Sequence, residues 1–444
     1  MGERVPARVL MRALAADVVA SVPVDTDPLE GDGPIGWPGY GGAHARAAER
    51  SGESESVVCG TGTVAGVPVT LVAFEFGFLG GSIGHRTGQR VRAALAQARE
   101  RGTPVVSLVA TGGSRTQEGM AALSQLHRIA TEMGRTRLAG VPQLAVALDP
   151  TTGGGWATLA SGADVTLATP GAQIGFAGSR VRPPGDEAAY TAEGQFAAGH
   201  VDAVVPERDL PAVVGRWVRL LTRPAVGPVA PPAALGAARP PRTGWEAVSA
   251  ARSPRRPRAD AYLDAHFDWR EDIRGDRVGG VDDGVACGFG WRGERSVAYA
   301  AQLGTPTTPT GFRTAARLVR LADRLGVPVL TLVDTVGAAN DGAAERAGAG
   351  GAIGALFAAI AEARVPVTTL VVGEGGSGGA LAFASSENTW MAPDSYFSVT
   401  SPEAAAAILK RDPSEVPATA DQLRLRPQDV VGLGLARGIV RPGA

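Results

Sequence analysis

The stretch GFRTAARLVRLADRLGVPVLTLVDTVG (residues 311–337) contains the clearest local signals of the fold class. Its first part places apolar residues at i, i+3 and i+4, which is the spacing of one helix face. A glycine and an x-Pro pair then end the helix, and a short apolar run rich in β-branched residues follows. The stretch therefore predicts a helix, a tight turn, a buried strand and a glycine loop, in that order.

The same order of features occurs earlier in the chain. Residues 88–113, GQRVRAALAQARERGTPVVSLVATGG, again give an amphipathic helix, a glycine, an x-Pro pair and a short apolar run. The match continues downstream, because the interval from Pro104 to Pro142 equals the interval from Pro328 to Pro366. Equal spacing of these prolines indicates that the chain contains an internal duplication.

One further strand is expected in each half, over residues 165–178 and 389–401. The repeat takes up about half of the chain, far beyond the length of a solenoid unit, so it predicts two copies of one domain. Between them, RPAVGPVAPPAALGAARPPR is rich in proline and alanine without periodicity, as extended linkers are. We therefore expect one domain at 1–222, a linker at 223–242 and a second domain at 243–444. Because buried strands alternate with helices, both domains should be α/β with largely parallel strands.

Composition excludes several classes of function. The net charge is -1, and RSPRRPR (residues 252–258) is the one notable basic run, so no footprint for nucleic acid exists. The apolar stretch near the N-terminus is broken by Arg12 and Asp17, which argues against a signal peptide or a membrane span. The two cysteines, Cys59 and Cys287, form no metal-binding motif and fit a reducing compartment. We expect a cytoplasmic protein that binds neither nucleic acid nor membrane.

The densest glycine loop is VVGEGGSGGALAF (residues 371–383). Gly373, Gly375 and Gly378 match the G-x-G-x-x-G of a dinucleotide-binding turn, and Asp394 follows near the spacing of a ribose-binding acid. A lone match of this kind is weak evidence, and it does not explain a related glycine loop in the first half. A nucleotide-binding oxidoreductase therefore remains the least favoured alternative.

Two glycine turns occur in each half, and together they indicate another use. They are ATGGSR (110–115) and TTGGG (151–155) in the first half, and DTVGAA (334–339) and EGGSGGA (374–380) in the second. Peptide N–H groups at a strand end and in the first turn of a helix can converge on a developing oxyanion, and side chains would block that approach. The pattern predicts two oxyanion holes, although glycine that only permits tight turns is the simpler reading of any single loop.

No histidine or acidic residue stands beside these loops in both halves. His85 is the one histidine near a glycine turn. Glu118, Glu374 and Asp334 are candidate bases, but helix capping and strand-end hydrogen bonding explain each of them. Two oxyanion holes without a shared general base favour enolate chemistry in which a substrate or cofactor supplies the base.

These motifs resemble the carboxyltransferase component of bacterial acetyl-CoA carboxylase, with its β and α subunits fused in one chain. The first half resembles the β subunit through FEFGFLGGSIG (74–84), ATGGSRTQEG (110–119), LDPTTGGG (148–155) and IGFAGSRV (174–181). The second half resembles the α subunit through the opening stretch, VVGEGGSGGALA (371–382) and YFSVTSPEAAAAIL (396–409). The resemblance covers about residues 56–440.

The resemblance implies two tandem crotonase-type domains built of stacked ββα units, with the acyl-CoA site between a β-type and an α-type domain. It implies that the thioester enolate is held by Gly112, Gly113, Gly153 and Gly154. Acyl-CoA is implied to bind at Gly80, Gly81, Ser82, Gly155 and Phe176. The ureido oxygen of carboxybiotin is implied to bind at Gly378, Gly379 and Ala380, beside Gly337 and Ala338.

The resemblance also implies the reaction and its partners. Carboxybiotin would lose CO₂, and the biotin enolate would deprotonate the acyl-CoA α-carbon, which matches the missing base. The product would be of the malonyl-CoA type used in fatty acid or polyketide biosynthesis. Biotin would arrive on a separate biotin carboxyl carrier protein loaded by a biotin carboxylase, the chain would hold no metal, and the assembly would be a homodimer or larger.

The chain departs from the family pattern at several places. Two cysteines cannot form the four-cysteine zinc ribbon of the β family. DTVGAAND (334–341) stands where the α family has DTPGAYPG, and a basic segment is reduced to AQLGTPTTPTGF (301–312). These departures leave two alternatives open: a biotin-independent enzyme that decarboxylates or otherwise forms the enolate of a malonyl-type thioester, and a non-catalytic scaffold within a carboxylase complex.

Overall fold

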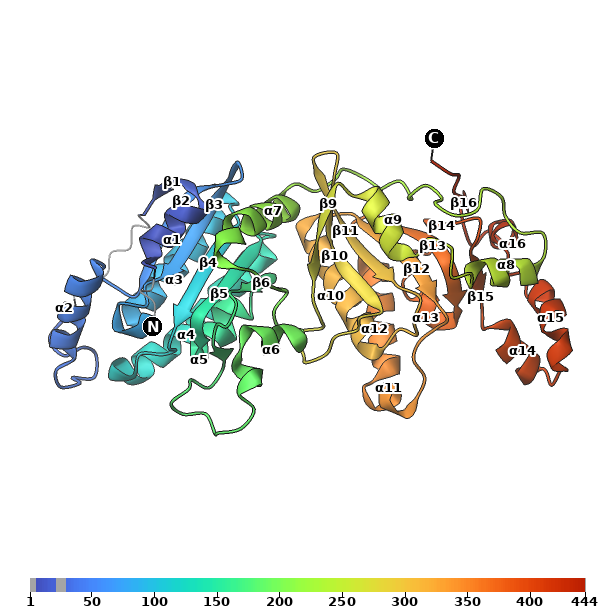
Figure 1. Ribbon diagram of the computed structural model, residues 1–444. Helices are drawn as coiled ribbons and strands as arrows, with labels where there is room; N and C mark the ends of the chain where they lie inside the picture. The colour runs from blue at the N-terminus through green and yellow to red at the C-terminus, as the bar shows by residue number, and fades with distance from the viewer. Residues whose placement is uncertain (1–4, 21–28, 444) are drawn as a thin grey trace. The chain divides into compact units, whose positions relative to one another are not determined.

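The computed structural model describes residues 5–20 and 29–443, and the chain divides into two compact units, Met1–Thr222 and Arg223–Ala444. Each unit contains one mixed sheet flanked by helices (Figure 1). None of the helices within the described residues is both long and apolar enough to cross a bilayer.

The sheet of the first unit has the strand order β1-β2-β3-β4-β5-β6-β8, and β7 also pairs with β5. Its strands are β1 (Ala16–Val19), β2 (Val57–Val64), β3 (Val67–Phe74), β4 (Val105–Thr111), β5 (Gln143–Thr152), β6 (Val165–Ala168), β7 (Ile174–Gly175) and β8 (Ala203–Val204). The helices are α1 (Ala7–Leu14), α2 (Tyr40–Ser51), α3 (His85–Arg101), α4 (Gly119–Leu138), α5 (Gly153–Gly155), α6 (Ala192–Ala197) and α7 (Leu210–Thr222). The β1–β2 and β2–β3 pairs are antiparallel and the other pairs are parallel, so the predicted α/β class is confirmed.

The second unit repeats this arrangement with the order β16-β14-β13-β12-β11-β10-β9, and β15 also pairs with β13. Its strands are β9 (Trp269–Ile273), β10 (Val285–Arg292), β11 (Arg295–Gln302), β12 (Val329–Thr335), β13 (Val367–Gly376), β14 (Thr389–Met391), β15 (Tyr396–Ser398) and β16 (Gly438–Ile439). The helices are α8 (Gly244–Ala251), α9 (Ala259–His266), α10 (Pro309–Leu325), α11 (Gly342–Arg346), α12 (Ala349–Glu362), α13 (Ser377–Leu381), α14 (Pro402–Ile408), α15 (Val416–Gln422) and α16 (Pro427–Gly432).

The opening stretch folds as its pattern predicts. Helix α10 begins after Thr308, whose side chain accepts a hydrogen bond from the Gly311 N–H, and Pro309 fits the first helical position. The helix ends at Gly326, which has a left-handed φ of 71°. The buried strand β12 follows. The same interval separates the starts of α3 and α10, of β4 and β12, and of β5 and β13. The predicted duplication is therefore confirmed.

The prediction of one continuous strand in each half, over residues 165–178 and 389–401, is wrong, because each half has two short strands there. In the first unit β6 ends at Ala168 and β7 begins at Ile174, because Pro170 lies between them and cannot donate a ladder hydrogen bond. Both strands nevertheless pair with β5, at successive parts of its length. The second unit breaks at Pro393 in the same way, giving β14 and β15 on β13.

Residues 223–242 contain no helix or named strand, as the Pro/Ala-rich composition predicts, but they lie along the second unit. The Ala225 N–H donates to Ser296 O at 2.9 Å, and the Ala234 N–H donates to Arg441 O at 2.9 Å. Ala234 is buried in the core that α9 forms on the second sheet. The segment therefore packs as an extended part of this unit.

Candidate functional site

In the first unit, two glycine turns meet at the carboxyl ends of β4 and β5. These strands are parallel neighbours, so the loops that follow them lie at the same edge of the sheet. A methyl group built on Gly153 would lie 3.0 Å from the Cα of Gly113, and both residues have positive φ angles, 61° and 102°. Glycine at both positions therefore permits this close approach.

A third loop, the short turn Leu79–Gly81, joins the same edge. The Gly112 N–H donates to Gly80 O at 2.9 Å. A methyl group on Gly81 would lie only 2.0 Å from Ala110 O, so a side chain there would push the turn off the end of β4. The structure thus brings together the first-unit residues that the resemblance assigned to enolate and acyl-CoA binding.

The backbone N–H groups of these residues are not equivalent. Those of Gly112, Gly113 and Gly153 already donate within the protein. Their acceptors are Gly80 O at 2.9 Å, Thr111 Oγ1 at 3.0 Å and Phe176 O at 3.1 Å. The Gly154 N–H lies in the first turn of α5, where N–H groups have no acceptor inside the helix. Among these four glycines, Gly154 is therefore the one whose N–H has no acceptor within its own helix.

The two remaining residues predicted to bind acyl-CoA in this unit, Gly155 and Phe176, differ in exposure. Phe176 is 74% exposed. Gly155 is buried, and a methyl group there would lie 2.2 Å from Thr111 Cγ2. Gly155 thus packs α5 against β4, whereas Phe176 presents an apolar ring to the surface.

The second unit has the same turn geometry. The Gly337 N–H donates to Thr335 Oγ1 at 3.1 Å, as Gly113 does to Thr111. The first residue of α13, Ser377, has a φ of 58°, matching the 61° of Gly153 at the start of α5. Gly378 therefore corresponds to Gly154. A methyl group on Gly378 would meet no atom within 4 Å, so its position opens outward.

The next two residues of α13 face the protein. A methyl group on Gly379 would lie 2.3 Å from Ala338 N, and Gly379 O accepts a hydrogen bond from Gln302 Nε2 at 3.1 Å. Ala380 is fully buried. The structure therefore brings Gly337, Ala338, Gly378 and Gly379 together, and it turns the Ala380 side chain into the core.

The three candidate bases are all engaged in ion pairs. Asp334 lies 2.6 Å from Arg256, and Glu374 lies 2.9 Å from Arg252. Glu118 accepts from Arg115 at 3.1 Å. Each of the three candidate carboxylates is therefore paired with an arginine.

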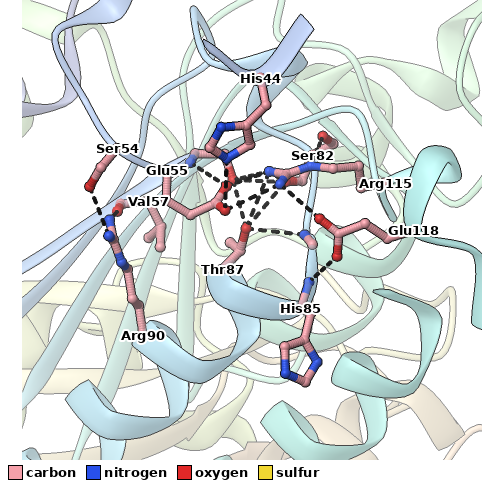
Figure 2. Close-up of polar contacts among 12 residues, drawn as sticks. His44, Ser54, Glu55, Val57, Ser82, His85, Thr87, Arg90, Arg115 and Glu118 are labelled. Atoms are coloured by element: carbon pink, nitrogen blue, oxygen red, sulfur yellow. Dashed lines mark hydrogen bonds and ion pairs between the residues drawn. The ribbon is translucent and has the colours of Figure 1, made fainter. Parts of the chain in front are cut away.

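The acid Glu118 is part of a larger buried network (Figure 2). We call it the Arg115 cluster. Its members are Tyr40, Glu55, Ser56, Ser82, Thr87, Arg115 and Glu118. The Arg115 side chain has no exposed surface, and it lies 2.5 Å from Glu55 and 3.1 Å from Glu118.

Electrostatics in this cluster favour the charged pair. Burial disfavours the carboxylate of Glu55, but His44 and Arg115 outweigh that effect, so the pKa of Glu55 lies below its usual range. Burial raises the pKa of Tyr40, which therefore keeps its proton. The sequence offered only one local signal for this network, the arginine and glutamate of SRTQE after the glycine turn. Glu55 is 60 residues away from Arg115 and could not be found from spacing.

Within the described residues, no group of three or more His, Cys, Asp or Glu side chains is arranged to hold a metal ion. His85 Nδ1 lies 3.0 Å from Gln125 Nε2, so this histidine is hydrogen bonded within the protein.

The protein therefore has two crotonase-like domains, each with two glycine turns that follow the carboxyl ends of neighbouring parallel strands. Two family models match the chain. The one described as acetyl co-enzyme A carboxylase carboxyltransferase-like matches residues 241–443, and the carboxyl transferase domain matches residues 42–199. The chain belongs to the acetyl-CoA carboxylase carboxyltransferase family of enzymes, with β-type and α-type halves in one polypeptide.

Curated relatives carry the same arrangement. The chain is 38% identical over 415 residues to the acetyl-coenzyme A carboxylase carboxyl transferase subunits beta/alpha of Saccharopolyspora erythraea, covering 89% of this chain and 73% of that relative. It is 38% identical over 432 residues to the protein of the same name from Salinispora arenicola, covering 89% and 75%. It is also 32% identical over 411 residues to a probable biotin-dependent acyl-coenzyme A carboxylase beta3 subunit of Mycobacterium bovis, covering 90% and 82%.

Solved structures share the fold. Transcarboxylase 12S, solved with hydrolysed methylmalonyl-coenzyme A bound, matches with a TM-score of 0.78 at 21% identity, covering 98% of this chain and 87% of that one. A single-chain, multi-domain long-chain acyl-CoA carboxylase matches with a TM-score of 0.75 at 21% identity, covering 99% and 46%. The predicted crotonase-type fold is therefore confirmed.

Proposed function

We propose that this protein transfers a carboxyl group from carboxybiotin to the α-carbon of a short acyl-CoA, converting acetyl-CoA to malonyl-CoA. The observation that carries the proposal is the matched pair Gly154 and Gly378, each the second residue of a short helix beside a glycine turn. The names of the curated relatives support acetyl-CoA as the substrate.

The first unit would hold the thioester. The Gly154 N–H, at the positive end of a short helix, is available to a thioester oxygen as negative charge develops on it. Losing one such donor typically costs ~2.7–4 kcal/mol of transition-state stabilisation. The Leu79–Gly81 turn and Ser82 lie beside this position and would seat the coenzyme A end of the substrate.

The second unit would receive the biotin ring. The space beside Gly378 would receive the ureido group, because a methyl group built there meets no atom within 4 Å outside its own helix and chain neighbours. Carboxybiotin would supply both the carboxyl group and the base, which accounts for the ion-paired state of Glu118, Glu374 and Asp334. We infer that a biotin carboxyl carrier protein and a biotin carboxylase act with this chain, which forms a homodimer or larger assembly.

A decarboxylation assay tests the proposal. Purified protein receives malonyl-CoA with and without free biotin, and the formation of acetyl-CoA is measured. Turnover that depends on biotin is expected. Equal turnover without biotin would instead support a biotin-independent enolate-forming decarboxylase, and no turnover with several acyl-CoA esters would support a scaffold role.

A further inference from the structure

The Leu79–Gly81 turn has an unfavourable backbone conformation. Leu79, Gly80 and Gly81 have consecutive positive φ angles of 47°, 68° and 63°. Leucine rarely adopts such a φ because its Cβ approaches the following carbonyl oxygen. A conformation of this kind persists only where surrounding contacts fix it.

The Gly112 N–H fixes the turn at Gly80 O, and Arg115 fixes the residues that directly follow the turn. Its Nε donates to Ser82 Oγ at 3.1 Å, and a terminal nitrogen donates to Ser82 O at 2.9 Å. Its backbone N–H donates to Ile83 O at 2.9 Å. Arg115 therefore binds both the side chain and the backbone carbonyl of Ser82, the residue that follows the strained turn.

Arg115 is itself held by groups from three other parts of the first unit. Glu55 precedes β2, and Glu118 precedes α4, and both contact the guanidinium group (Figure 2). The Tyr40 hydroxyl from α2 accepts a hydrogen bond from Arg115 at 3.0 Å and donates one to Glu118 at 2.5 Å. The planar guanidinium matches this set of acceptors, whereas a lysine ammonium at the same place could not bond all of them.

The second unit shows what the side chain adds. Backbone hydrogen bonds link Thr307 to Gly337 and Ala339, as they link Ile83 to Gly113 and Arg115. At the position of Arg115 the second unit has Ala339, which lacks the guanidinium. The corresponding loop there has a positive φ only at Gly304. The arginine thus occurs in the unit whose turn has three consecutive positive φ angles, and it is absent from the unit whose loop has one.

We propose that Arg115 is a positioning residue for acyl-CoA: it holds the Leu79–Ser82 segment against the first-unit glycine turns, in the conformation that receives the substrate. This inference rests on the proposed function only in assigning acyl-CoA to that segment. Arg115 would not touch the substrate, because its side chain is completely buried.

The test compares Arg115→Lys with Arg99→Lys, a matched control. Arg99 pairs with Glu132 at 2.8 Å between α3 and α4 of the same unit, away from the turn. In Arg115→Lys, amide hydrogen exchange in residues 76–84 should accelerate. The KM for malonyl-CoA should rise about tenfold, as expected when a binding segment is misplaced, while the KM for free biotin stays unchanged. Arg99→Lys should change none of these values.

Tyr40→Phe provides a milder variant in case Arg115→Lys fails to fold, and it should change the same quantities in the same direction by less. Unchanged exchange in residues 76–84, or a fall in kcat with no change in either KM, would overturn the proposal. If the wild-type protein fails to turn over malonyl-CoA, the proposed function falls separately. In that case, amide hydrogen exchange in residues 76–84 and the calorimetric Kd for coenzyme A test the role of Arg115. A Kd that is the same for Arg115→Lys and the wild type would refute the proposed role.

Discussion

Gly154 and Gly378 occupy the same position in the two units, each directly after a left-handed residue at the start of a short helix. Their surroundings differ. A methyl group on Gly154 would lie 2.4 Å from Leu126 Cδ2, whereas one on Gly378 would meet nothing within 4 Å. The two positions therefore allow different tests of the candidate site.

Gly378→Ala should abolish or strongly reduce biotin-dependent turnover and leave the fold intact. The added methyl group would occupy the proposed ligand space without touching protein atoms. Alanine is also favoured over glycine in a helix by about 1 kcal/mol, so the unfolding temperature should not fall. Gly354→Ala in α12 is the control, since that glycine is also free of neighbours within 4 Å. Full activity in Gly378→Ala would remove this residue from the site.

Gly154→Ala should reduce both activity and stability. Its methyl group overlaps the Leu126 side chain, and overpacking of this kind typically costs about 1–3 kcal/mol. The double variant Gly154→Ala/Leu126→Ala should recover stability in thermal unfolding but not the decarboxylation of malonyl-CoA. Recovery of both would mean that Gly154 contributes packing and no oxyanion contact.

The Arg115 cluster should make the first unit sensitive to acid. The pKa of Glu55 is lowered in the folded state, so its contribution to stability is present above the unfolded value near 4.5 and is lost as the pH falls below it. Urea unfolding at pH 7 and at several values below 4.5 measures this loss. Glu55→Gln should be less stable at pH 7, by the roughly 3–5 kcal/mol typical of a broken buried pair. The free energy of unfolding of Glu55→Gln should also fall less on acidification than that of the wild type. An equally steep fall in this variant would show that groups other than Glu55 cause the acid sensitivity.

The thiols should be unreactive in the native protein. Burial raises the pKa of Cys59 from 9.0 to about 12, and it raises the pKa of the buried Cys287 as well. Because the unfolded thiols ionise first, stability should decline as the pH rises from 9.0 towards 12. Ellman's reagent at pH 8 should modify neither cysteine until denaturant is added. Rapid modification of the native protein would contradict the buried positions of both thiols.

Local patterns were enough to predict much of the fold. The helix, turn, strand and glycine loop of residues 311–337 follow from apolar spacing and from Gly326 and Pro328, which act over a few neighbouring residues. The duplication followed from equal proline spacing. The division of each third strand into two segments was missed, because pairing of both segments with one long neighbour is a property of the sheet.

Turn chemistry and apolar periodicity are local, so the sequence alone predicts glycine turns after parallel strands in both halves. Which N–H groups are already hydrogen bonded depends on the folded chain, since the acceptors of Gly112 and Gly153 belong to separate loops, at Gly80 and Phe176. The tertiary structure alone also joined Arg115 to Glu55 across 60 residues. A buried charge needs partners from whichever elements surround it, and that surrounding exists only once the chain has folded.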